Sequence, residues 1–439
     1  MSVNTRKLSV ALAATALAAV CSAASAFTKP PFPRIAGIQI GSPFNYNDQN
    51  YQAALAKQNL TILGMYPGLA PGGSLNAQVQ AIKAKNPNTL VFLYTNANEL
   101  RPGVSGSDPW GSYRAKLNSM QWWVYPGASL VPVASTFESG FQEINQTLFT
   151  PKDSNGDHAV EWIAKYYVNS YYKANPAIDG FFMDNVFRKP SVDADWNRDG
   201  KVDSQNDATV QSWYRQGYAR YFNLASSLMP GKFQIGNIGD WAETGTVPTE
   251  YQNVVNGGVL EGYIGKSYSV ESWGGWQGMM GRYTKIMASF QEPKLGIFNQ
   301  WGDSTDYQSM RYGLASTLMN DGYYSFTDNT AQYHGVSWFD EFDAKLGQAT
   351  TLPPTAAWQK GVWRRDFDNG IALVNPKGNG TQTVTLDTSY VKLKGTQDPA
   401  TNNGQTVTTV TLKDRDGIIL MRKNPVKRPA APQKLSADD

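Results

Sequence analysis

IDGFFMDNV, residues 178–186, is an apolar run that ends in a carboxylate, Asp184, and an amide, Asn185. A continuous apolar run of this length is typical of a strand that is buried on both faces of a parallel sheet. Burying an ionised carboxylate inside such a strand is costly, because the charge loses its hydration. We therefore expect Asp184 to stand where the strand emerges from the sheet, at a place where its charge is used.

Seven further apolar runs are like this one, and they alternate with helix-like segments. The eight expected strands span residues 34–41, 60–67, 89–96, 178–185, 233–239, 258–264, 294–300 and 322–328. Eight strands that alternate with helices over about 300 residues predict a (β/α)8 TIM barrel. An open doubly wound sheet is the alternative, but no glycine-rich dinucleotide fingerprint follows the first strand.

The pattern changes toward the C-terminus. Short alternating strands, separated by turn signals such as Asp-Asn-Gly at 368–370, predict a small antiparallel β-sandwich over residues 355–423. The barrel domain is predicted to cover residues 27–350. Residues 424–439 are rich in Pro, Ala and charge, which predicts a disordered tail.

One connection inside the predicted barrel, residues 97–157, is too long for an ordinary loop. It carries several large aromatic residues: Trp110, Trp122, Trp123 and Tyr125. Long loops of this kind are often lids or binding loops, and the alternative is a surface excursion whose aromatic rings pack on the barrel. The sequence leaves both interpretations open.

Residues 1–26 have the pattern of a secretory signal peptide. Arg6 and Lys7 precede an apolar run, and the small residues 24–26 suit cleavage after Ala26. We therefore expect a secreted or periplasmic protein that keeps no membrane anchor. Cleavage removes the single cysteine, Cys21, and with it any disulfide or thiol chemistry. The formal net charge of only +3 gives no reason to expect a nucleic-acid partner, and we expect a monomer.

In a TIM barrel, the catalytic groups stand at the carboxyl ends of the strands. Here those ends carry acids, amides and aromatic residues, namely Tyr94, Asn96, Asp184, Asn185, Asn237, Glu261, Asn299, Gln300, Trp301 and Asp328. Amides can bind sugar hydroxyls, and two carboxylates can cleave an acetal by acid catalysis together with nucleophilic or base catalysis. The sequence therefore predicts a carbohydrate site at this rim.

Asp184 and Glu261 are the predicted catalytic acids, because each stands in an otherwise apolar strand. The alternative for Asp184 is a helix cap or a partner of Arg188, and the alternative for Glu261 is a buried ion pair. The rival acids are Asp328, Asp240 and Asp303. With two histidines, no G-x-S-x-G elbow and no phosphate-binding loop, zinc, serine-hydrolase and nucleotide chemistry are disfavoured.

A second motif, DWNRDGKVDSQND at residues 195–207, has the spacing of an EF-hand calcium loop. Its predicted ligands are Asp195, Asn197, Asp199, the Lys201 carbonyl, Asp203 and Asn206. Asn206 stands where such loops carry a bidentate acid. We expect a structural Ca²⁺ in an EF-like or dockerin-like loop, and the alternative is an Asx-rich turn without metal.

Several motifs in order resemble the bacterial glycoside hydrolases grouped as hypothetical glycosyl hydrolase family 15, over roughly residues 32–423. They are IDGFFMDNV, GVLEGYI (258–264), GLASTLMNDGYYSF (313–326), WFDEF (338–342) and GVWRRDFDNGIALVNP (361–376). The resemblance implies a secreted TIM-barrel glycosidase with a C-terminal β-domain, and it puts the catalytic acid roles on Asp184 and Glu261. The first motif is also similar to glycoside hydrolase family 114, whose implied activity is endo-cleavage of galactosamine-containing polymers.

The main hypothesis is therefore a secreted glycoside hydrolase that cleaves a poly- or oligosaccharide with two carboxylates. One alternative is a non-catalytic carbohydrate-binding barrel, in which the acids would be dispensable. Another is an exopolysaccharide hydrolase that resembles the endo-galactosaminidases, and a third is a structural cell-surface protein that docks through its β-domain.

Overall fold

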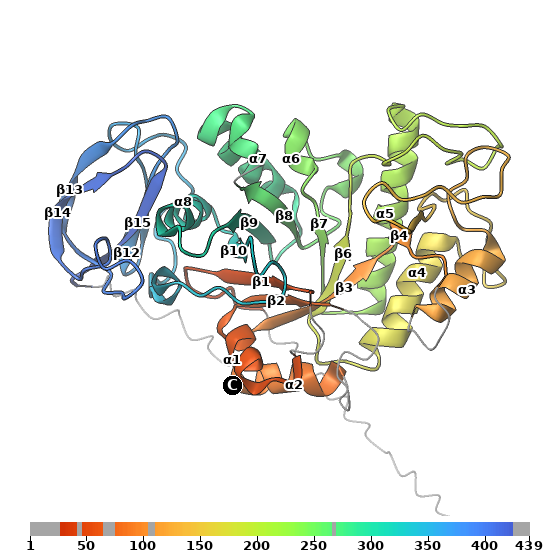
Figure 1. Ribbon diagram of the computed structural model, residues 1–439, viewed down its shortest axis with the longest axis horizontal. Helices are drawn as coiled ribbons and strands as arrows, with labels where there is room; N and C mark the ends of the chain where they lie inside the picture. Colours follow the sequence, from red (N-terminus) through yellow and green to blue (C-terminus); the bar gives the residue numbers. More distant parts are fainter. Residues whose placement is uncertain (1–26, 42–45, 65–74, 104–109, 266–268, 425–439) are drawn as a thin grey trace, which may run out of the picture.

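The computed structural model describes residues 27–41, 46–64, 75–103, 110–265 and 269–424. At its centre, eight parallel strands close into a barrel in the order β1-β10-β9-β8-β7-β6-β3-β2 (Figure 1). These strands are β1 (Ile35–Gln39), β2 (Leu60–Leu63), β3 (Leu90–Asn96), β6 (Gly180–Asp184), β7 (Phe233–Asn237), β8 (Gly257–Ile264), β9 (Leu295–Gly302) and β10 (Tyr323–Asp328). Each predicted strand is present, and the predicted TIM barrel is confirmed. The predicted signal peptide and the tail from residue 425 lie outside the described residues.

Helices alternate with the barrel strands. They are α1 (Gln49–Lys57), α2 (Leu75–Lys85), α3 (Gly111–Met120), α4 (Ala159–Tyr167), α5 (Ala208–Leu228), α6 (Trp241–Thr244), α7 (Gly275–Ser289) and α8 (Tyr307–Leu318). Aspartates cap three of them: the carboxylates of Asp48, Asp207 and Asp306 accept hydrogen bonds from backbone N–H groups in the first turns of α1, α5 and α8. In the part of the chain that the structure describes, no helix combines the length and apolar character needed to cross a membrane.

The interior of the barrel is an apolar core that fills the space between the strands. It is built from alternate residues of each strand, such as Phe92, Phe182, Ile235, Val259 and Ile297. Successive side chains of a strand point to opposite faces, so the intervening residues pack outward against the helices. Phe181 and Met183 belong to this outer core. The inward-facing series therefore decides which strand-end residues lie above the barrel interior.

The C-terminal region forms one antiparallel sheet in the order β11-β12-β15-β13-β14. Its strands are β11 (Trp363–Phe367), β12 (Gly370–Asn375), β13 (Gln382–Lys392), β14 (Thr406–Leu412) and β15 (Asp416–Arg422). The predicted antiparallel β-structure is thus present, as a single five-stranded sheet with an apolar core of its own. Figure 1 shows this sheet, in blue, beside α8.

Close packing and buried ion pairs hold the sheet on the barrel. The backbone of Gly417 in β15 lies so near α8 that an added Cβ would be 2.5 Å from the Cβ of Ala315. Arg311 of α8 donates to the Asp398 carboxylate at 2.5 Å. Arg365 of β11 pairs with Asp321 at 2.6 Å. The sheet and the barrel are therefore joined by close packing and by ion pairs.

Candidate active site

Three polar side chains continue the inward-facing series beyond the apolar core. Asp184 follows Phe182 at a spacing of two residues on β6, and Glu261 follows Val259 in the same way on β8. Asn237 occupies the equivalent position on β7, which pairs with both strands. Because the interval of two keeps a side chain on one face, all three side chains stand above the barrel interior.

The Asn237 amide joins the two predicted catalytic acids. Its Nδ2 donates to Oδ1 of Asp184 at 3.1 Å and to Oε2 of Glu261 at 2.8 Å. Hydrogen bonds that run along the two N–H directions of a planar amide, which diverge by about 120°, would place the two bound oxygens about 5 Å apart. Each acid also accepts from a tyrosine: Tyr94 donates to Asp184 Oδ2 at 2.7 Å, and Tyr333 donates to Glu261 Oε1.

Both acids open into one cavity of 330 Å³. Its lining residues are Ile38, Ile40, Gly41, Tyr94, Glu99, Phe137, Glu138, Phe182, Asp184, Asn185, Asn237, Val259, Glu261 and Tyr333. Among the described residues, this lining contains four carboxylates and no lysine or arginine. The cavity is therefore an acidic pocket with apolar and aromatic walls.

Burial disfavours the charge on these acids. It is the largest influence on Asp184 and raises the pKa of this carboxyl, although hydrogen bonds from Tyr94, Asn237 and the Asn185 N–H act in the opposite direction. Burial also raises the pKa of Glu261, and the charge of Asp184 adds to the effect. For Glu99, burial together with the nearby Asp184 raises the pKa to about 7. Raised carboxyl pKa values suit groups that exchange protons near neutral pH.

The long connection over residues 97–157 has features of both alternatives: aromatic rings that pack on the barrel, and residues that line a cavity. Trp122 and Trp123 are buried and pack on the barrel, as a surface excursion would. Glu99, Phe137 and Glu138 of the same connection nevertheless line the acidic pocket. Sequence reasoning missed these three residues, and it missed Tyr333, because none of them ends a barrel strand.

Two predicted binding residues near β3 and β6 have different positions. Asn185 lines the cavity and has a left-handed backbone with φ of 55°, which turns the chain directly after Asp184. Asn96 is buried, and its Oδ1 accepts from the backbone N–H groups of Asn98 and Glu99. Its amide therefore shapes the loop that brings Glu99 to the cavity, and it does not line the cavity itself.

Asn299 and Gln300 of β9 are fully buried. The Asn299 amide donates to Ser325 and Thr327 of β10, and its Oδ1 accepts from the Gly262 N–H. Gln300 points to the outer face, where it bonds Ser309 of α8 and the Tyr324 hydroxyl. Direct sugar binding by these two amides stays a prediction that their placement does not favour.

Trp301 and Asp328 lie at the same rim, outside the acidic pocket. The Trp301 ring packs edge-on against the Tyr333 ring, with centroids 5.4 Å apart. The Asp328 carboxylate accepts from the backbone N–H groups of Ser304, Thr330 and Ala331. Burial would raise the pKa of Asp328, but these hydrogen bonds outweigh it and lower the pKa. Asp328 is therefore a structural anchor for two rim loops.

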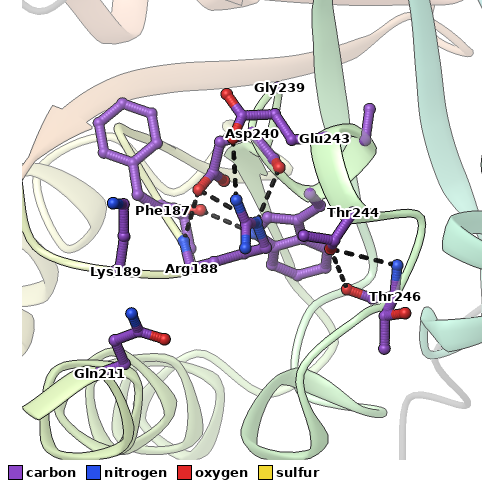
Figure 2. Close-up of polar contacts among 12 residues, drawn as sticks. Phe187, Arg188, Lys189, Gln211, Gly239, Asp240, Glu243, Thr244 and Thr246 are labelled. Carbon is purple, nitrogen blue, oxygen red and sulfur yellow. Dashed lines mark hydrogen bonds and ion pairs between the residues drawn. The ribbon is translucent and has the colours of Figure 1, made fainter. Parts of the chain in front are cut away.

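Asp240 belongs to a separate ion-pair cluster, shown in Figure 2. Its Oδ2 accepts from the Arg188 N–H at 2.8 Å, and the Arg188 guanidinium bonds the Asp240 carbonyl and the Glu243 carboxylate. Burial raises the pKa of Asp240 to about 7 in spite of Arg188. Arg188 is thus engaged away from Asp184, and the rival acid Asp303 is exposed and accepts from its own loop.

The predicted calcium loop is an Asx-rich turn in the structure. The Asp195 carboxylate accepts from the backbone N–H groups of Asp199 at 3.0 Å and Gly200 at 2.9 Å. Asp203 accepts from the chain at 196–197, and the Asn206 side chain accepts from Lys189 at 2.8 Å. Over the described ranges, no group of three or more His, Cys, Asp or Glu side chains is placed to hold a metal ion. Calcium binding by this loop stays a prediction.

Paired carboxylates at the carboxyl-terminal rim of a (β/α)8 barrel are typical of the glycoside hydrolases. The family comparison supports this class: the model of hypothetical glycosyl hydrolase family 15 matches residues 144–371, which is just over half of the chain. The chain belongs to hypothetical glycosyl hydrolase family 15, and its class is that of the glycosidases. No curated protein matches the sequence.

Similarities to solved structures are weak. The glycoside hydrolase domain of PelA from Pseudomonas aeruginosa has 13% identity and a TM-score of 0.41, over 70% of this chain and 98% of that domain. The debranching enzyme from Nostoc punctiforme has 12% identity and a TM-score of 0.48, over 86% and 88% of the two chains. The GH36 α-galactosidase AgaA from Geobacillus stearothermophilus has 9% identity and a TM-score of 0.44, over 90% of this chain and 56% of that one.

Proposed function

We propose that this glycosidase is exported and hydrolyses a poly- or oligosaccharide by a double displacement in which Asp184 is the nucleophile and Glu261 the general acid and base. The observation that carries the proposal is the Asn237 amide, which binds one oxygen of each carboxylate. Retaining glycosidases hold their two carboxyl groups about 5–5.5 Å apart, and inverting ones about 6.5–9.5 Å apart. The separation of about 5 Å that the shared amide sets falls in the retaining range.

The hydrogen bonds support this division of roles. Asp184 accepts from Tyr94, from Asn237 and from the Asn185 N–H at 2.9 Å. Burial raises the pKa of Asp184, and these three donors oppose that shift in favour of the ionised form that a nucleophile requires. Glu261 accepts two hydrogen bonds, from Asn237 and Tyr333, and the nearby charge of Asp184 favours the protonated form of Glu261. The Tyr333 hydroxyl can donate to a carboxylate or accept from a carboxylic acid, so it can serve Glu261 in both states.

In the first step, Asp184 attacks the anomeric carbon while Glu261 gives its proton to the glycosidic oxygen. The bond to the leaving sugar breaks, and an ester forms between Asp184 and the anomeric carbon. In the second step, Glu261 takes a proton from a water molecule, which attacks the anomeric carbon and releases Asp184. The product keeps the anomeric configuration of the substrate.

A reducing-end release assay tests the proposal. The chain from residue 27 to 439 would be incubated with a panel of bacterial and plant polysaccharides, with Asp184→Asn and, as the control, Asp193→Asn, an exposed acid that lines neither rim cavity, alongside. Release by wild type and Asp193→Asn, with loss in Asp184→Asn, is the expected result. Equal release by all three would reject Asp184 as the nucleophile. Binding of a polysaccharide without release by folded wild type would favour the non-catalytic barrel.

A second candidate narrows the substrate to polymers that contain galactosamine. The observation in its favour is the acidic lining of the cavity, where the described residues include four carboxylates and no lysine or arginine. Such a cavity attracts a free amino sugar, which carries a positive charge at neutral pH, more than its N-acetylated form. Faster cleavage of a de-N-acetylated galactosamine polymer than of the acetylated polymer would support this candidate, and the reverse order would reject it.

Export rests on residues 1–26, which precede the described part of the chain. The basic end, the apolar run and the small residues before position 27 support cleavage after Ala26. N-terminal sequencing of the protein recovered outside the cytoplasm should begin at Phe27. Recovery in the cytoplasm with an intact Met1 would reject this part of the proposal.

A further inference from the structure

A second cavity, of 350 Å³, opens at the same rim of the barrel. Its walls include Trp301, Asp303, Asp306, Asn329, Thr330 and Arg415. The volume lies within the range of about 300–1,000 Å³ that is usual for small-molecule sites. None of the residues that line this cavity also lines the catalytic one.

Two aromatic rings form the wall between the cavities. Trp301 lines the second cavity and Tyr333 lines the catalytic cavity, and their rings meet edge to face at 86°. Tyr333 donates its hydroxyl hydrogen to Glu261. The second cavity therefore lies on the Glu261 side of the catalytic pair, whereas Tyr94 holds Asp184 on the other side.

The second cavity is preformed, because hydrogen bonds to the Asp328 carboxylate hold its two loops in place. One Asp328 oxygen accepts from the Ser304 N–H at 3.0 Å, and the other accepts from Thr330 and Ala331 at 2.8 Å each. The Asn329 N–H donates to the Gly302 carbonyl at 2.8 Å. These bonds join the loop after β9 to the loop after β10, so the two walls of the cavity are fixed relative to each other.

The lining suits a sugar ring without negative charge, because it includes the carboxylates of Asp303 and Asp306. Trp301 is half-buried, so part of its ring is available to the face of a sugar, and Asn329 and Thr330 can bond hydroxyl groups. Arg415, which comes from the C-terminal sheet, is already bonded to Glu271 at 3.1 Å and to Ser309 at 3.2 Å. The cation is thus neutralised, and nothing in this cavity selects an anion.

We propose that the cavity beside Trp301 is a second sugar subsite, and that it holds the leaving-group portion of the chain. The inference rests on the proposed function, because Glu261 protonates the leaving oxygen and the cavity lies on its side. A substrate must then extend beyond the cleaved bond, across Tyr333 and onto Trp301. This arrangement favours chains over single glycosides with a small leaving group.

Binding tests the subsite without requiring turnover. The Asp184→Asn protein would be applied to an array of hexose, N-acetylhexosamine and hexosamine oligomers of one to six units. The affinity should rise with chain length. Adding Trp301→Ala to the Asp184→Asn protein should lower the affinity for the longer chains about tenfold. Trp301→Phe should keep most of the gain, because it retains an aromatic face. Trp358→Ala, a half-buried tryptophan that lines neither cavity, is the matched control.

Two outcomes would overturn the subsite: equal binding by the Trp301→Ala and Trp358→Ala proteins, or no binding of any chain. Turnover separates this failure from a failure of the proposed function. If wild type cleaves a polysaccharide but Trp301 makes no difference, only the subsite fails. If the binding gain depends on Trp301 but no chain is cleaved, the subsite stands as a binding site and the proposed hydrolysis fails.

Kinetics on a cleaved oligosaccharide distinguish a sugar contact from a structural role. Trp301→Ala should raise KM for chains and leave the pH profile of kcat unchanged, because the hydrogen bond between Tyr333 and Glu261 is kept. Asn329→Ala, which removes an exposed side chain, should raise KM in the same direction by a smaller factor. A shifted pH profile in Trp301→Ala would mean that Trp301 acts through Tyr333, and the subsite would be rejected.

Discussion

The barrel rim has two halves that look alike in sequence and differ in the structure. Over β6, β7 and β8, the strand-end residues Asp184, Asn237 and Glu261 stand above the interior and line a cavity. Over β9 and β10, the side chains of Asn299 and Gln300 are buried and hydrogen-bonded to neighbouring residues, and Asp328 anchors two loops. In our proposal, the first half carries the chemistry and the second half builds the wall beside it.

The difference comes from the direction of each side chain and from what covers it. Gln300 and Asp328 are offset by an odd number of residues from the inward-facing Ile297 and Tyr323, so they point away from the interior. Asn299 does share the inward face, but Gly262 and Thr327 take up its hydrogen-bonding groups. Here, a polar strand-end side chain therefore lines the acidic pocket only where it is inward-facing and not covered by neighbouring groups.

Asp184→Asn against Asp328→Asn is the strongest contrast between the two halves. Loss of the nucleophile should lower kcat about 10⁴-fold, because an amide cannot form the glycosyl ester. Asp328→Asn should keep kcat within about tenfold, since its role is to hold loops. Reducing-end release at saturating polysaccharide measures both. A larger loss in Asp328→Asn, with its fold intact by circular dichroism, would reverse the assignment of the two halves.

Asn237→Ala should mainly lower kcat, whereas Asn299→Ala should mainly lower the stability of the fold. Asn237→Ala removes the donor shared by both acids and should lower kcat about 10²-fold, with little change in stability. Asn299→Ala leaves buried Ser325, Thr327 and Gly262 groups without a partner and should lower the free energy of unfolding by about 1–3 kcal/mol. Assays of kcat and urea unfolding on both variants check this. Similar profiles for the two variants would contradict it.

A variant of Glu143 tests whether burial raises the pKa values of the carboxyl groups in the long connection. Burial is the main cause that raises its pKa from an ordinary 4.5 to about 7. The protonated carboxyl is favoured in the folded state, so its contribution is fully present below pH 4.5 and is lost as the pH rises through 7. Glu143→Gln cannot ionise and should be more stable than wild type at pH 8, by about 1–3 kcal/mol, and similar at pH 4.5.

Urea unfolding of both proteins at the two pH values measures this effect. Glu99 lies opposite Glu143 in the β4–β5 pair, Glu99–Leu100 with Gln142–Glu143, and its pKa is raised in the same way. Glu99→Gln therefore serves as a matched variant. An equal difference between wild type and Glu143→Gln at both pH values would show that folding does not raise the pKa of Glu143.

Calcium should give the smallest effect. If the loop at 195–207 binds Ca²⁺, millimolar CaCl₂ should raise the melting temperature by a few degrees relative to EGTA. The effect should vanish in Asp199→Ala, because that side chain is a predicted ligand. The loop contacts the long connection, where the Asp195 N–H donates to the Tyr125 carbonyl at 2.8 Å. Identical melting curves with and without calcium would favour the Asx-rich turn without metal.

The sequence predicted the strands well because apolar runs of this length have few other uses. It also brought Asp184 and Glu261 to one rim, since parallel strands end on the same side of a barrel. It could not find Glu99, Glu138 or Tyr333, because these residues come from loops whose path depends on long-range packing. It could not show how the β9 amides are placed: Gln300 falls on the outer face, whereas Asn299 shares the inward face but is bonded to Gly262, Ser325 and Thr327.

The anomeric form of the first product tests the central claim, that a shared amide holds a nucleophile and an acid at retaining distance. Proton NMR spectra would be recorded during the first minutes of cleavage of a polysaccharide that the wild type degrades, before mutarotation mixes the anomers. A first product with the anomeric configuration of the substrate is predicted. A first product of the opposite configuration would contradict the double displacement at Asp184.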